Sequence, residues 1–129
     1  MLSLEFDKED EIFYIRNRGD YEIEDVVKVT KRLIEDYSEL KVVRQMTDFR
    51  HGKLTFQWSS VLSEITQLRK GLDELSSTFQ DFYAAQVFSE NANVSLINFF
   101  MQLRKPPNYH VKVFKSIEEA RLWLINVHK

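Results

Sequence analysis

The chain has 129 residues, of which 43% are hydrophobic, and its formal net charge is −2 at pH 7. This length and composition are typical of one globular domain, 1–129. The 18 basic and 20 acidic residues argue against a nucleic-acid partner, because binding to nucleic acid usually requires a basic stripe. The absence of cysteine excludes disulfides, thiol catalysis and cysteine-bound metals, and the three scattered histidines show no metal-ligand spacing, so we expect no cofactor.

The chain also shows no pattern that would direct it to a membrane. Its N-terminus lacks a basic segment followed by an apolar run, so no signal peptide is expected. No apolar run approaches the ~20 residues that cross a bilayer. We therefore expect a soluble, cytoplasmic protein without stable membrane association.

The first part of the chain predicts two strands, a helix and a third strand. Leu2–Phe6 alternates apolar and polar residues, while Ile12–Arg16 is apolar on both faces and predicts a more central strand. The short charged turn between them predicts an antiparallel hairpin. Apolar residues recur at helical spacing over Ile23–Tyr37 and predict an amphipathic helix. A buried strand follows at Val42–Asp48, and the helix would form a right-handed crossover if its flanking strands are parallel.

A polar elbow follows this strand, where Asp48, Arg50 and His51 crowd its end. In open α/β sheets, ligands and partners bind outside the carboxyl ends of the strands, so we expect any function near this elbow. The three residues could form an acid–cation–imidazole site for catalysis, which would require a substrate cavity. In the alternative, structural interpretation Asp48 accepts hydrogen bonds from loop amides and Arg50 pairs with it.

The residues after the elbow predict a second helix. Thr55 is expected to cap a helix that starts at Phe56 and has an apolar stripe over Trp58–Leu68. Gly71 is expected to stop it. The segment Leu72–Gln80 is consistent with either a continuation of the helix or a loop. The Thr55 hydroxyl is a candidate phosphorylation site as well as a candidate cap.

The next strand, Phe82–Phe88, ends in a second polar exit that contains Ser89, Asn91 and Asn93. If this strand lies beside Val42–Asp48, both exits and the two following helix N-termini meet on one rim. Such a rim would favour an anion or a carboxylate of a partner. Plain capping of the following helix is the alternative role for these polar residues.

A third helix is predicted over Val94–Leu103, and it carries more apolar bulk than one helix face can bury. Leu96, Phe99 and Leu103 are therefore expected to be exposed as an apolar surface, which usually indicates a partner, a second copy of the chain or a lipid. Leu96, Phe99 and Phe100 are the candidate binding residues of this helix. In the alternative interpretation, the segment Leu72–Gln80 covers these apolar residues.

A last strand and helix complete the chain. Val111–Phe114 predicts the strand, and Ser116 followed by Glu119 predicts a capping box at the start of the helix. The resulting order, β-β-α-β-α-β-α-β-α, is that of an α/β fold with a single mixed, mostly parallel sheet flanked by helices.

This order and several residues resemble the SpoIIAA-like branch of the STAS superfamily. The matching features are the N-terminal hairpin, the strand that ends in Asp48, the strand Phe82–Phe88 and the ending Val113-Phe-Lys-Ser-Ile-Glu-Glu-Ala-Arg-Leu-Trp-Leu. The resemblance implies a module for protein interaction or for small apolar ligands. The family's phosphorylatable Asp-Ser-Ser-Gly element is missing here, and Thr55 is the nearest hydroxyl to its position.

Three hypotheses for the function follow. The first is a non-enzymatic interaction or regulatory module that presents the rim and the third helix to another protein or to a second copy of itself. The second is a carrier of a small apolar ligand or lipid, with a pocket between the third helix and the sheet. The third is an enzyme that uses Asp48 and His51. The expected pocket residues of the second are Phe82, Phe88, Ile97, Phe100 and Met101.

Overall fold

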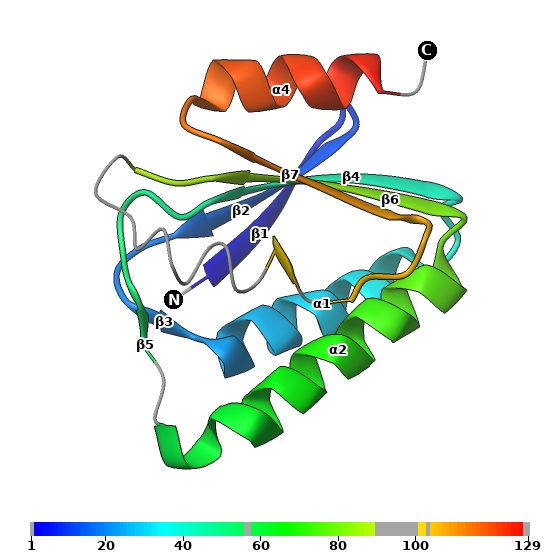
Figure 1. Ribbon diagram of the computed structural model, residues 1–129. Coiled ribbons are helices and arrows are strands. Elements are labelled where there is room, and N and C mark those ends of the chain that lie inside the picture. The colour runs from blue at the N-terminus through cyan, green and yellow to red at the C-terminus, as the bar shows by residue number, and fades with distance from the viewer. Residues whose placement is uncertain (1, 56–57, 90–100, 103, 128–129) are drawn as a thin grey trace.

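The computed structural model describes residues 2–55, 58–89, 101–102 and 104–127. In this part of the chain, one sheet contains five strands in the order β1-β2-β4-β6-β7 (Figure 1). β1 and β2 are antiparallel, and β2, β4, β6 and β7 run parallel to one another. The strands are β1 (Leu2–Asp7), β2 (Ile12–Asn17), β4 (Val42–Asp48), β6 (Asp81–Val87) and β7 (Tyr109–Phe114). The predicted α/β fold with a mixed, mostly parallel sheet is thereby confirmed.

Helices cover both faces of this sheet. Helices α1 (Ile23–Tyr37) and α2 (Val61–Thr78) lie on one face, and α4 (Ile117–Asn126) lies on the other (Figure 1). Because side chains alternate along a strand, the inner strands β2, β4 and β6 contribute to a core on each face of the sheet. Phe13, Val43 and Phe82 pack with Leu33 of α1 and Leu75 of α2. On the opposite face, the core of Ile12, Met46, Ala85 and Val87 packs with Ala120 and Leu124 of α4.

A separate two-stranded sheet lies beyond the carboxyl ends of β2 and β4. It pairs β3 (Tyr21–Glu22) in parallel with β5 (Leu54–Thr55). The expectation that Thr55 caps a helix starting at Phe56 is therefore wrong. Thr55 belongs to β5, and its hydroxyl donates to the Tyr21 carbonyl at 3.3 Å. A short 3₁₀ helix, η1 (Trp58–Ser60), precedes α2.

Gly71 does not stop the second helix, as the sequence had suggested. Helix α2 continues to Thr78, which also decides the open question about the segment Leu72–Gln80 in favour of a continued helix. A Cβ atom at Gly71 would lie 3.5 Å from Cγ2 of Thr30 in α1. The glycine therefore marks a close approach of α1 and α2. The predicted third helix, Val94–Leu103, lies outside the described residues except for 101–102.

Candidate functional site

The exits of β4 and β6 lie side by side, as the rim hypothesis requires. Asp48 and Val87 are register partners at the ends of the two strands. The Phe49 amide then donates to the Val87 carbonyl at 2.8 Å. The turns that contain Asp48 and Ser89 therefore start at the same edge of the sheet, and the predicted adjacency of the two exits is confirmed.

At this edge, Asp48 and Arg50 form a closed side-chain pair. Nε and Nη2 of Arg50 donate to the two carboxylate oxygens of Asp48, each at 2.9 Å, and the Arg50 amide donates to Oδ1 at 3.1 Å. Burial works against ionisation of Asp48, but the hydrogen bonds from Arg50 outweigh it and hold the pKa of Asp48 below its ordinary value. Nε2 of His51 lies 4.0 Å from Oδ2 of Asp48. This geometry is the one that the structural interpretation expects.

The three elbow side chains lie at the surface. The exposed fraction is 36% for Arg50 and 67% for His51, while Asp48 is more covered. None of the three lines the cavity described below. Within the described residues, the elbow therefore offers a charged surface, and we see no enclosed space there that would hold a substrate.

The other residues proposed for the rim separate into two groups. Ser89 is half-buried directly after β6, and Thr55 is exposed and bonded to β3 rather than to a helix. The remaining proposed residues fall outside the described part of the chain: Asn91, Asn93, Leu96, Phe99 and Phe100.

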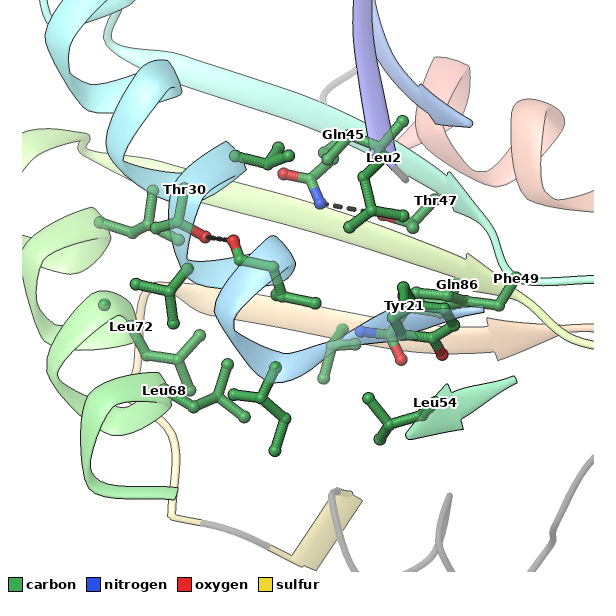
Figure 2. Close-up of a pocket in the computed structure, with 18 of the residues that line it drawn as sticks. Leu2, Tyr21, Thr30, Gln45, Thr47, Phe49, Leu54, Leu68, Leu72 and Gln86 are labelled. Atoms are coloured by element: carbon green, nitrogen blue, oxygen red, sulfur yellow. Dashed lines mark hydrogen bonds between the residues drawn. The ribbon is translucent and has the colours of Figure 1, made fainter. Parts of the chain in front are cut away.

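A cavity of about 150 Å³ lies between the sheet and the helices α1 and α2. Figure 2 shows helix side chains on one side of this space and strand side chains on the other. Much of the helical wall is aliphatic, and it is formed by Val26, Val27 and Val29 of α1 and by Leu68, Leu72 and Leu75 of α2. The cavity is thus mainly apolar, with walls from two different layers of the fold.

A polar strip interrupts this apolar lining on the sheet side. It consists of Gln45 and Thr47 of β4 and Gln86 of β6, and all three line the cavity (Figure 2). Thr47 and Gln86 are direct register partners. Nε2 of Gln45 donates to Oγ1 of Thr47 at 3.0 Å. Among the residues that the structure describes, the Gln86 amide makes no hydrogen bond.

Three aromatic rings form a stack in the cavity wall near the carboxyl ends of the strands. The ring centroids of Tyr21 and Phe49 are 5.0 Å apart with an interplanar angle of 26°, and those of Phe49 and Phe88 are 5.0 Å apart at 18°. Tyr21 is 6% exposed, and its burial raises the pKa of the phenol. Because Phe49 stands between Asp48 and Arg50, the cavity wall and the charged elbow share one short segment.

The pocket expected from the sequence differs from the cavity observed. Phe88 and Met101 line the cavity, as expected. Phe82 does not, because its side chain is 1% exposed and packs in the core with Phe13 and Val43. Ile97 and Phe100 lie outside the described residues.

Sequence reasoning missed the polar strip. The signal was available, since Gln45 and Thr47 alternate with Met46 in a strand predicted to be buried. In a sheet covered on both faces, polar side chains within a central strand point into an interior layer and call for a partner.

The described residues lack two further kinds of feature. No helix among them has the length and apolar character needed to cross a membrane. Within the same ranges, no three His, Cys, Asp or Glu side chains are grouped so that they could hold a metal ion.

Comparison with known proteins identifies the fold. No protein-family model and no curated protein matches the chain. The chain is similar in structure to an uncharacterised protein of the DUF3478 family with a SpoIIAA-like fold, from Shewanella loihica. The TM-score is 0.58 at 16% sequence identity, and the match covers 96% of this chain and 92% of that one. The protein therefore has a SpoIIAA-like fold, as its resemblance to the STAS superfamily predicted.

Proposed function

We propose that this domain is a non-enzymatic binding module that holds a small, mainly apolar molecule in the cavity beneath α1 and α2. The observation that carries the proposal is the cavity itself, about 150 Å³ with aliphatic walls from both helices. An apolar cavity of roughly 150 Å³ in another protein binds benzene, which sets the scale of the ligand. Pockets for drug-sized ligands are larger, about 300–1,000 Å³, so a fragment-sized ligand fits better.

The character of the lining favours binding over catalysis. Among the described lining residues, Lys105 is the one with a charged side chain, and its ammonium group donates to the Met101 carbonyl. Asp48 and His51, the pair considered for catalysis, belong to the exposed elbow and not to this lining. General acid–base chemistry requires an ionisable group within hydrogen-bond reach of the substrate. A ligand held in the cavity would meet mainly aliphatic and aromatic groups, with amides, hydroxyls and the Lys105 ammonium as the polar groups of the described lining.

Binding can be measured by titrating the isotope-labelled protein with toluene and following amide chemical shifts by NMR. We expect saturable shifts near Leu72, Leu75 and Phe49, with a dissociation constant of about 0.1–1 mM for so small a ligand. Leu68→Trp should fill the cavity and weaken binding about tenfold or more, because the larger ring takes the volume that the ligand needs. Leu62→Trp is the matched control, since Leu62 is on the same helix but is 79% exposed.

Two results would refute this proposal. One is the absence of saturable shifts with toluene in the unmodified protein. The other is equal binding by the Leu68→Trp and Leu62→Trp variants when both retain the wild-type circular dichroism spectrum.

Interaction with another protein, or with a second copy of this chain, is a second candidate function. The observation in its favour is the exposed charged elbow, where Arg50 and His51 stand at the carboxyl edge of the sheet. Light scattering coupled to size-exclusion chromatography measures self-association. A concentration-dependent dimer that Arg50→Glu converts to a monomer would support this candidate, and a dimer unchanged by that substitution would count against the elbow.

A further inference from the structure

We propose that the ligand of this cavity is a small, uncharged, planar ring with a lactam or carboxamide group, which pairs with the side-chain amide of Gln86 and the hydroxyl of Thr47. This inference rests on the proposed binding function and adds the chemical class of the ligand. It is carried by the polar strip, because that strip stands in an otherwise apolar interior layer.

Thr47 is buried and Gln45 and Gln86 are half-buried, so the strip is partly withdrawn from water. β4 and β6 are inner strands, since β4 lies between β2 and β6 and β6 lies between β4 and β7. On the face that carries Thr47 and Gln86, the neighbouring interior residues include Val43 and Ala84. A polar group placed in such a layer costs free energy unless it finds a hydrogen-bond partner.

The strip has unused hydrogen-bonding capacity that points into the cavity. The Gln45 amide donates to Oγ1 of Thr47, so the Thr47 hydroxyl accepts one bond and still has its own proton to donate. The Gln86 amide keeps a donor and an acceptor side by side, with no partner among the described residues. A ligand with a matching pair of donor and acceptor would form two parallel hydrogen bonds with Gln86 and accept a third from Thr47.

The charges around the cavity favour an uncharged ligand. No acidic side chain is present in the described lining, so a cationic ligand would have no counter-ion there. Lys105, the cation in that lining, has the Met101 carbonyl as an acceptor. A neutral amide keeps strong hydrogen bonds without the cost of burying a charge.

The shape of the wall favours a flat ring. Tyr21 and Phe49 are drawn near Gln86 in the cavity lining (Figure 2), and Phe88, which also lines the cavity, continues their stack. Aromatic faces prefer offset stacking with another planar ring. A cavity of about 150 Å³ accepts benzene, so a six-membered ring with one or a few added atoms is the expected size.

Three probes of equal size separate these contributions: 2-pyridone, phenol and toluene. 2-Pyridone carries an N–H and a carbonyl side by side, phenol carries one hydroxyl, and toluene carries no polar group. We expect Gln86→Met, which preserves side-chain length, to weaken 2-pyridone binding about tenfold, as the loss of its hydrogen bonds predicts. Toluene binding should change by less than about threefold because its contacts are apolar. Gln80→Met is the matched control, since Gln80 is exposed outside the cavity.

A measurement on the unmodified protein makes the test independent of any folding defect. The side-chain NH₂ signals of Gln86 should shift on saturation with 2-pyridone and move much less with toluene. If toluene and phenol bind but 2-pyridone binding is insensitive to Gln86→Met and leaves the NH₂ signals unchanged, this inference is wrong while the proposed function stands. Tighter binding of benzoate than of 2-pyridone would also overturn it. If none of the probes binds, ordered water satisfies the strip and the proposed function fails as well.

Discussion

Replacing Gly71 with alanine is expected to stabilise the protein, although the sequence pattern alone marks this glycine as the end of a helix. Gly71 lies inside α2, which continues to Thr78. A glycine in a helix interior is less favourable than alanine by about 0.5–1 kcal/mol, because it loses more backbone entropy on folding. The added methyl group would meet Cγ2 of Thr30 at 3.5 Å, which is an ordinary van der Waals contact.

The magnitude combines two favourable contributions. The helix propensity gives about 0.5–1 kcal/mol, and partial burial of the methyl against α1 adds a further few tenths, up to about 0.8 kcal/mol for a fully buried group. We therefore expect Gly71→Ala to raise the free energy of unfolding by about 1 kcal/mol and the melting temperature by roughly 3–6 °C. Urea unfolding followed by circular dichroism at 222 nm measures the former, with an unchanged dependence on urea concentration.

Gly19→Ala is the matched control for the assay. Gly19 has φ = +108° and nothing within 4 Å of its added Cβ, so alanine there introduces backbone strain without a clash. That substitution should lower stability by about 1 kcal/mol or more. A Gly71→Ala variant that is less stable than the wild type would refute the reasoning. It would mean that α2 ends at Gly71, or that the added Cβ lies closer to Cγ2 of Thr30 than the expected 3.5 Å and clashes with it.

Three further predictions concern the loop contact at Gly52, the core residue Leu75 and the Asp48–Arg50 pair. Gly52→Ala should destabilise the protein by about 2 kcal/mol or more in the same urea assay, since its Cβ would lie 1.8 Å from the Gly19 carbonyl oxygen; wild-type stability would show that the two loops are not in contact. Leu75→Ala should cost about 3–5 kcal/mol, because Leu75 is 3% exposed and packs in the core; a loss below about 1 kcal/mol would contradict that packing. NMR titration should give Asp48 a pKa below the ordinary value of an aspartate, and Arg50→Gln should raise this pKa; a wild-type pKa at or above the ordinary value would argue against the pair. Because the folded-state pKa is depressed, the stability linked to Asp48 is present above the unfolded-state pKa and is lost as the pH falls through the folded-state value.

The main sheet was predictable because its strands follow simple local patterns. Ile12–Arg16 is apolar on both faces, and the structure places β2 inside the sheet between β1 and β4. The period of the apolar residues in Ile23–Tyr37 matches a helix, and α1 has these bounds. Such patterns depend on neighbours within one element, so they can be recognised without knowing the rest of the fold.

The errors arose where a distant contact decided the local structure. Gly71 follows basic residues, as a helix stop often does, but it lies inside α2, where it faces Thr30 of α1. Thr55 has the residue type of a helix cap, but it pairs with Glu22 more than 30 positions earlier in the chain, in a ladder that no local pattern encodes. The two segments are brought together by the main sheet, since β3 follows β2, β5 follows β4, and β2 pairs with β4.

The candidate site was predictable in position but not in content. The adjacency of the exits after Asp48 and Val87 follows from parallel neighbouring strands, and the register confirms it. The cavity could not be derived in the same way, because its walls come from seven strands, β1 to β7, and from α1 and α2, which lie far apart in the sequence. Whether Gln86 faces a packed helix or an open space depends on the volumes of all these side chains together.

The small β3–β5 sheet gives one end of the cavity a weak closure. Its ladder consists of the pairs Tyr21–Leu54 and Glu22–Thr55, and Tyr21 and Leu54 both line the cavity. Breaking so few hydrogen bonds requires only a local fluctuation, whereas separating β4 from β6 requires disruption of the core. The Tyr21 amide, which donates to the Lys53 carbonyl at 3.0 Å, should therefore exchange with deuterium well before the amides of the inner strands. Transient opening of the β3–β5 ladder would let a ligand enter the cavity while the five-stranded sheet stays intact.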